Sequence, residues 1–77
     1  MVRTIITGAA GRMGTRLVAL TLDTPGLQLS GAIEAKDHPA LGRDAGEVAQ
    51  IGQVNIPITD NLNTCLSQSD VVIDFTA

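Results

Sequence analysis

A glycine-rich turn directly after an apolar, β-branched run is the feature that most constrains the fold of this chain. The run Val2–Thr7 leads into Gly8-Ala9-Ala10-Gly11-Arg12-Met13-Gly14, after which the pattern becomes helical. Gly8 allows a sharp turn at the strand end, Gly11 lets the backbone approach a pyrophosphate, and Gly14 lets the helix pack closely on the sheet. This order of strand, glycine turn and helix predicts a dinucleotide-binding unit.

An acidic residue at the end of a second strand supports this prediction. The segment Leu27–Glu34 has the composition of a strand and ends twenty residues beyond Gly14. At the carboxyl end of that strand, Glu34 is placed to accept hydrogen bonds from both hydroxyls of an adenine ribose. The alternative is a solvated acid at a strand end.

Two cationic residues near these positions each have two interpretations, one as a contact to the cofactor and one as an ordinary solvated side chain. Arg12 falls in the first helical turn, where the dipole disfavours a cation unless a phosphate stands in front of it. Lys36 is close enough in sequence to Glu34 to offset a 2′-phosphate, which the carboxylate would otherwise repel. Either residue could instead be simply solvated. Because of that repulsion, we expect NADH to be accepted at least as well as NADPH.

The rest of the chain continues the alternation of helix and strand. The helix beginning at Arg12 should bury positions 13, 17, 20 and 21 and end before Pro25, which removes a backbone donor. Pro57 places the third strand at a sheet edge. The other expected segments are an irregular stretch over 35–54 with a helical turn near 45–50, a strand over 54–58, a short helix over 61–68 capped by Asp60 or Asn61, and a strand over 71–75.

Composition bounds the size of the domain and its partners. The 77 residues are 44% apolar with Phe75 as the one aromatic, which predicts one small domain with a core of Val, Ile, Leu and Met. A net charge of −3 without a basic cluster argues against nucleic acid. No apolar run reaches the roughly 18 residues of a membrane span. One cysteine, Cys65, excludes an internal disulfide and fits a cytoplasmic location.

The residues that could carry chemistry do not form a catalytic set. His38 and Cys65 have no third partner at a useful spacing, and no cluster has metal-ligand spacing. We interpret His38 as a solvated loop residue, Cys65 as structural, and Asp44 and Glu47 as loop or capping residues. The sequence therefore predicts a binding unit with no catalytic residue and no metal.

Together these segments predict an α/β fold: a Rossmann-like parallel sheet of about four strands with flanking helices, truncated after the fourth strand. Strands 1 and 4 should be neighbours, and the available helices would leave one face of the sheet bare. We infer that residues 1–77 are the N-terminal part of a dinucleotide-binding domain whose substrate and catalytic domain is absent. The alternatives are an S-adenosylmethionine-binding methyltransferase domain and a non-catalytic nucleotide-sensing module.

Four motifs resemble one enzyme family over nearly the whole chain. They are Thr7-Gly8-Ala9-Ala10-Gly11-Arg12-Met13-Gly14, Gly31-Ala32-Ile33-Glu34, Leu41-Gly42-Arg43-Asp44-Ala45-Gly46-Glu47 and Val72-Ile73-Asp74-Phe75-Thr76. Together they look like the N-terminal half of the 4-hydroxy-tetrahydrodipicolinate reductases (dihydrodipicolinate reductases). The resemblance implies a two-domain enzyme of lysine and diaminopimelate biosynthesis that reduces a cyclic imine-type substrate with NADH or NADPH.

The resemblance also implies roles for individual residues. Glu34 would bind the adenine ribose, and Phe75 and Thr76 would approach the nicotinamide. The family often has Arg directly after the acid, where this chain has Ala35, and this departure agrees with the charge argument against NADPH. Catalytic residues, a small-molecule substrate site and most tetramer contacts would lie beyond Ala77. The remaining residues that the resemblance assigns to the cofactor, around its pyrophosphate, are Gly8, Ala9, Ala10, Gly11, Arg12 and Met13.

Overall fold

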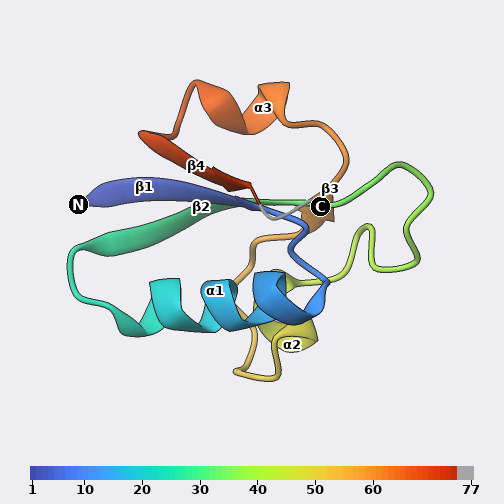
Figure 1. Ribbon diagram of the computed structural model, residues 1–77, viewed down its shortest axis with the longest axis horizontal. Helices are drawn as coiled ribbons and strands as arrows, with labels where there is room; N and C mark the ends of the chain where they lie inside the picture. Colours follow the sequence, from blue (N-terminus) through green and yellow to red (C-terminus); the bar gives the residue numbers. More distant parts are fainter. Residues whose placement is uncertain (75–77) are drawn as a thin grey trace.

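The computed structural model describes residues 1–74 as four parallel strands and three helices (Figure 1). The strand order in the sheet is β3-β2-β1-β4, so β1 and β4 are neighbours and β3 lies at an edge, as the sequence predicted. In chain order the elements are β1 (Val2–Thr7), α1 (Arg12–Asp23), β2 (Leu27–Ile33), α2 (Ala45–Val48), β3 (Ile58–Thr59), α3 (Asn63–Leu66) and β4 (Val71–Asp74).

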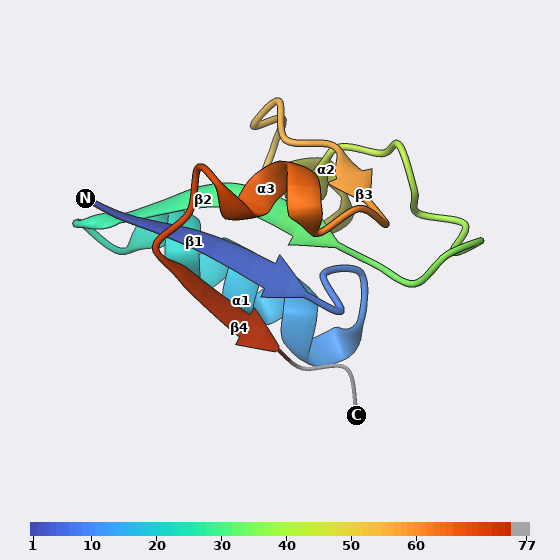
Figure 2. The same cartoon turned by 90° about the horizontal axis from the view of Figure 1, so that it is seen from above.

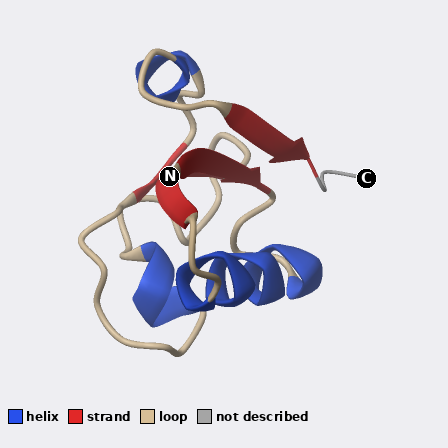
Figure 3. Ribbon diagram, turned by 90° about the vertical axis from the view of Figure 1, so that its left-hand side faces the viewer, coloured by secondary structure: helices blue, strands red, loops and turns tan. Residues whose placement is uncertain are grey.

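The elements form three layers. Helices α1 and α2 lie on one face of the sheet and α3 on the other (Figures 1 and 3). Because all four strands are parallel, their carboxyl ends lie at one edge, where the glycine turn leaves β1 (Figure 2). The Rossmann-like α/β class predicted from the sequence is therefore confirmed for the residues described.

The main core lies between the sheet and α1. Ile6, Val18 and Ile58 are almost fully buried there, so the core is aliphatic as expected. The predicted helix face was wrong in part, because Met13 and Leu20 are 48% and 60% exposed. The close approach of Gly14 to the turn sets the rotation of α1, and the buried positions are 14, 18 and 21. The methionines consequently add little to the core.

One carboxylate organises the irregular stretch between β2 and β3. Asp44 is the N-cap of α2, and its side chain accepts hydrogen bonds from the backbone amides of Glu47, Val54 and Ile56 at 3.0–3.1 Å. The single turn of helix expected near 45–50 is thus present and fixed from its N-terminal end. The capping role predicted for Asp44 is confirmed.

The same carboxylate explains why β3 is shorter than predicted. Two amides that an edge strand over 54–58 would present, those of Val54 and Ile56, are directed to Asp44. Asn55 between them has a φ of 62°, in the left-handed region that interrupts a strand. Strand pairing therefore begins only at Ile58, which lies beside Ala32 of β2.

The second face of the sheet is only partly covered. Helix α3 is one short turn, shorter than the predicted 61–68, and its N-cap is Leu62 rather than Asp60 or Asn61. The Asn61 side-chain oxygen still accepts from the Asn63 amide at 3.1 Å. Cys65 of this helix packs against Gly31, where an added Cβ would lie 2.9 Å from its sulfur. Val72 of β4 remains 38% exposed. The sequence predicted that one face would stay bare, whereas α3 covers part of it and leaves the side of β4 partly exposed.

The single substitution Gly14→Ala should lower the free energy of unfolding strongly. A Cβ at this position would overlap the Gly8 carbonyl oxygen and lie 2.8 Å from the Ala9 Cα, and both obstacles are backbone. Overpacking of this kind costs about 1–3 kcal/mol or more, despite the better helix propensity of alanine. Urea denaturation should show a lower midpoint. Arg16→Ala, on the exposed side of α1, is the control; equal midpoints for the two variants would contradict the close packing.

The contribution of Asp44 to stability should depend on pH. Partial burial alone would raise the pKa of its carboxyl, but the backbone hydrogen bonds outweigh burial and hold the pKa below its ordinary value of 3.8. A depressed pKa in the folded state means that the stabilisation is complete above the unfolded-state value and is lost as the pH falls through the folded-state value.

Asp44→Asn should therefore lower the free energy of unfolding at pH 7, and the difference from the parent should shrink below about pH 4. Urea denaturation at pH 7, 5 and 3 measures this difference. Glu47→Gln is the control, because only the backbone amide of Glu47 contacts Asp44. A difference that is constant down to pH 3 would show that the Asp44 charge has no such role.

Candidate functional site

The candidate site is the turn between β1 and α1 at the carboxyl edge of the sheet. Gly8 has a φ of 66°, a conformation that side chains rarely adopt, and this reverses the chain directly after β1. Gly14, in the first turn of α1, lies against the Gly8 carbonyl and so brings the helix N-terminus close to the strand end. The two positions have the mechanical roles that the sequence predicted.

The three amides that follow Gly8 are already hydrogen-bonded within the protein. The Ala9 amide donates to the Ile33 carbonyl of β2 at 3.1 Å, and the Gly11 amide donates to the Gly8 carbonyl at 3.0 Å. Between them, the Ala10 amide donates to the Glu34 carboxylate at 2.9 Å. These three bonds fix the turn to itself and to the end of β2.

The next three amides are open. Within residues 1–74, no hydrogen bond is made by the backbone amides of Arg12, Met13 and Gly14, whereas the Thr15 amide donates to the Gly11 carbonyl at 2.9 Å. The N-cap residue is Gly11, which has no side chain to accept from them, and the first turn contains no acid. A helix N-terminus left in this state is suited to bind an anion, because open amides and the dipole both favour negative charge.

Arg12 adds a cation to this end of the helix. Its side chain is exposed and forms no ion pair with the residues described, in contrast to Arg3, whose guanidinium lies 3.2 Å from Asp70. A basic first-turn residue opposes the dipole in an isolated helix. The arrangement becomes favourable only with a phosphate in front of the open amides, so the functional interpretation of Arg12 stays a prediction.

Glu34 lies directly after β2, beside the turn. Its amide donates to the Thr59 carbonyl of β3 at 2.9 Å, which continues the sheet hydrogen bonding by one residue. One carboxylate oxygen accepts from the Ala10 amide and the other from the Ala35 amide at 3.0 Å. The side chain is only partly buried, so further lone pairs remain accessible to the hydroxyls of a ligand.

A second polar contact lies at the carboxyl end of the neighbouring strand, β4. The Thr7 hydroxyl donates to the Asp74 carboxylate at 2.6 Å, which joins the carboxyl ends of β1 and β4. At the opposite end of the same pair, Arg3 binds Asp70 through its backbone amide and its guanidinium. These contacts hold β4 beside β1 and so fix the edge from which the glycine turn leaves.

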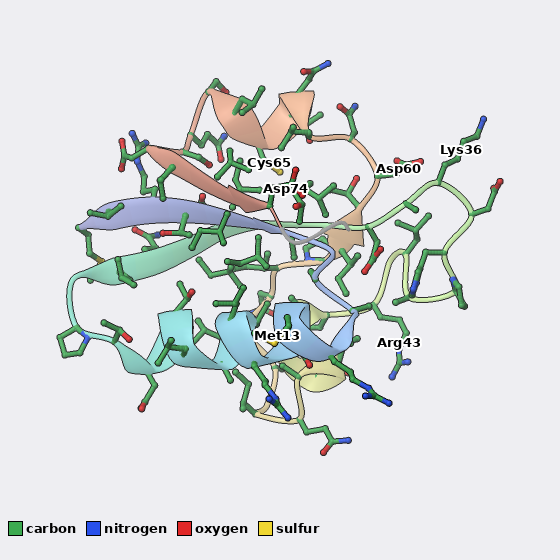
Figure 4. The ribbon with its side chains drawn as sticks, in the orientation of Figure 1. Met13, Lys36, Arg43, Asp60, Cys65 and Asp74 are labelled. Carbon is green, nitrogen blue, oxygen red and sulfur yellow. The ribbon has the colours of Figure 1, made fainter. Side chains whose placement is uncertain are left out.

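The structure brings most of the predicted site residues together, but not all of them. The turn from Gly8 to Met13 and the Glu34 carboxylate form one cluster. Lys36 is exposed and points away from the body of the protein (Figure 4), without a contact to Glu34. Phe75 and Thr76 lie outside the described residues. Within the described residues, the candidate site therefore consists of the glycine turn, the N-terminus of α1 and Glu34.

Sequence reasoning missed two interactions that shape this cluster, the bond from Ala10 to Glu34 and the bond from Thr7 to Asp74. Both could have been found from the register of a parallel sheet. Thr7 pairs with Ile33 on one side and with Asp74 on the other, so the residue after β2 and the last residue of β4 lie next to the end of β1, where the glycine turn begins.

Other kinds of site find no support in residues 1–74. No group of three or more histidine, cysteine or acidic side chains could hold a metal ion there. No helix in that part of the chain has the length and apolar character needed to cross a bilayer. The exposed groove between the outer side of α1 and residues 51–54, with a volume of about 630 Å³, is lined mainly by apolar side chains and lies away from the glycine turn.

The parallel sheet, the glycine turn and the uncapped helix N-terminus define the class as a Rossmann-like domain. Comparison with known families then makes the assignment specific. The family model described as "Dihydrodipicolinate reductase, N-terminus" matches residues 2–77, and the chain belongs to this family.

Curated relatives that bear the name of this enzyme family align with the whole length of the chain. The 4-hydroxy-tetrahydrodipicolinate reductases of Anaeromyxobacter dehalogenans strain 2CP-1, Syntrophus aciditrophicus and Pelobacter propionicus are 48%, 44% and 46% identical to it over 77 residues. Each alignment covers 100% of this chain but only 28–29% of the relative. The resemblance to this family is thus confirmed, but the chain spans less than a third of the length of these reductases and not the expected half.

Arg12→Glu should separate anion binding from helix stability. A glutamate at the first helical position interacts favourably with the dipole by about 0.3–1 kcal/mol, so the thermal midpoint should be unchanged or slightly higher. Reversing a charge about 4 Å from a bound phosphate removes on the order of 2 kcal/mol in water, which lowers the affinity for inorganic pyrophosphate by about tenfold or more.

Nuclear magnetic resonance titration with pyrophosphate measures this affinity, and circular dichroism measures the thermal midpoint. Arg16→Glu is the matched control, since it makes the same change of charge one turn further along α1, on the exposed side of the helix. Equal loss of pyrophosphate affinity in both variants would show that net charge, and not the position of Arg12, is responsible.

Proposed function

We propose that this chain is the NAD(P)H-binding portion of a 4-hydroxy-tetrahydrodipicolinate reductase. The observation that carries the proposal is the division of the turn amides: those of residues 9–11 are bonded within the protein, and those of residues 12–14 are open. A pyrophosphate supplies the acceptors that the open amides lack, and the Arg12 cation adds to the attraction.

Glu34 supplies the second half of the cofactor site. Its carboxylate stands beside the turn with lone pairs left for the two hydroxyls of the adenine ribose. A nucleotide that extends from the open amides to Glu34 crosses the carboxyl edge of the sheet, the usual position for a ligand in an open α/β sheet. S-adenosylmethionine has no phosphate, so this helix N-terminus favours a dinucleotide over the methyltransferase alternative.

The choice between the two cofactors follows from charge. A 2′-phosphate on the ribose would meet the Glu34 carboxylate, and the nearest cation in sequence, Lys36, points away from the body of the protein. We therefore expect NADH to bind at least as well as NADPH. This order agrees with the presence of Ala35 directly after the acid.

The proposal for the whole enzyme rests on the named relatives. When bound, NAD(P)H supplies a hydride, which would reduce a cyclic dicarboxylate in lysine and diaminopimelate biosynthesis. The role of this chain is to hold and orient the cofactor. Residues 1–77 would form the N-terminal part of the dinucleotide-binding domain. The substrate and catalytic domain, a cytoplasmic location and assembly as a tetramer complete the proposal.

Paired titrations of the full-length protein with NADH and NADPH test the function. We expect saturable enhancement of nicotinamide fluorescence, with a dissociation constant for NADH no larger than that for NADPH. Glu34→Ala should weaken NADH binding about tenfold or more, because hydrogen bonds to a charged group are worth about 1.5–3 kcal/mol each.

Glu47→Ala provides the control for Glu34→Ala. It also removes one negative charge, but from α2, and within residues 1–74 no hydrogen bond or ion pair of the Glu47 carboxylate is seen. Its NADH affinity should match that of the parent. A tenfold preference of the parent protein for NADPH would overturn the charge argument, and the absence of any nicotinamide binding would overturn the proposed function.

A further inference from the structure

We propose that Glu34 is a positioning residue for the glycine turn, in addition to its role as ribose acceptor. This inference deepens the proposed function by assigning a second task to the same side chain. The hydrogen bond from the Ala10 amide to the Glu34 carboxylate, at 2.9 Å, is made entirely within the protein. It joins the middle of the turn to the residue after β2.

The turn has few other attachments to the sheet. The Gly11 amide donates to the Gly8 carbonyl, which lies within the turn itself. The Ala9 amide donates to the Ile33 carbonyl, so Ile33 and Glu34, consecutive in the chain, provide the hydrogen bonds that reach the turn from β2. Gly8 and Gly11 add backbone freedom on both sides of Ala10. A charged acceptor is well suited to restrain such a segment.

The orientation of the carboxylate is itself fixed. Its second oxygen accepts from the Ala35 amide at 3.0 Å, and the Glu34 amide donates to the Thr59 carbonyl at 2.9 Å. Glu34 is therefore held by β3 and by its own neighbour before it reaches the turn. This rigidity lets one side chain set the distance between the ribose position and the open amides of α1.

The two tasks of Glu34 couple the two ends of the cofactor site. Any ligand group that displaces the carboxylate from Ala10 also releases the segment from which α1 begins. A 2′-phosphate would act in this way by repulsion, so the disadvantage of NADPH includes a loss of order in the turn. Pre-organising the turn before binding raises affinity because less conformational freedom is lost on binding.

Amide hydrogen exchange of the full-length protein, measured without cofactor, tests the positioning role directly. In Glu34→Ala the Ala10 amide should exchange at least about tenfold faster, a change of about 1.4 kcal/mol in its opening free energy. The Ala9 amide, bonded to Ile33, should keep its rate and serves as the internal control. Glu34→Gln retains a carbonyl oxygen of the same reach and should give an intermediate rate at Ala10.

Binding of a modified cofactor supplies the second measurement. NADH with a 2′,3′-dideoxyadenosine group has no ribose hydroxyls for Glu34, so a residue that only accepts from those hydroxyls cannot affect its affinity. We expect Glu34→Ala to weaken the binding of this analogue by about threefold to tenfold, and Glu47→Ala to leave it unchanged.

The outcomes are distinct. Faster exchange at Ala10 together with weaker analogue binding supports the positioning role. Unchanged exchange at Ala10, or faster exchange with unchanged analogue affinity, overturns it. If the parent protein binds neither NADH nor the analogue, the proposed function fails, and the exchange rates at Ala10 still decide whether Glu34 fixes the turn.

Discussion

The close contact between Gly14 and the Gly8 carbonyl is the constraint on which the rest of the structure depends. It brings the first turn of α1 against the end of β1, at a separation that leaves no room for a Cβ. The contact sets which side of α1 faces the sheet, and so makes Val18 a core residue while Leu20 is exposed. It also places the open amides of α1 at the carboxyl edge, beside the end of β2.

The candidate site depends on which backbone amides are hydrogen-bonded within the protein and which are left open. Three consecutive amides fix the turn, and the next three have no acceptor among residues 1–74. Open amides at a helix N-terminus are usually satisfied by a capping side chain or by water, and here the N-cap is glycine. A bound phosphate would complete the helix. The geometry of the turn and the family to which the chain belongs therefore both agree with a dinucleotide ligand.

The sequence was sufficient for the fold and for the outline of the site, because both depend on local patterns. Gly8, Gly14 and the β-branched run before them determine the strand, turn and helix. Glu34 was found because it ends the next predicted strand, twenty residues beyond Gly14. The sequence was insufficient where a distant partner decides the local structure. Asp44 takes two amides that would have extended β3, and the packing of Gly14 rotates α1 away from the face predicted by the spacing of Met13 and Leu20.

The most direct test of the central claim is a nuclear magnetic resonance titration of the labelled full-length protein with NADH, following the backbone amides of residues 9–14. The account predicts large shifts and slowed exchange for Arg12, Met13 and Gly14 on saturation, whereas the Ala9 and Gly11 amides, already bonded, keep their exchange rates. Saturable NADH binding that leaves the amides of Arg12, Met13 and Gly14 unchanged would contradict it.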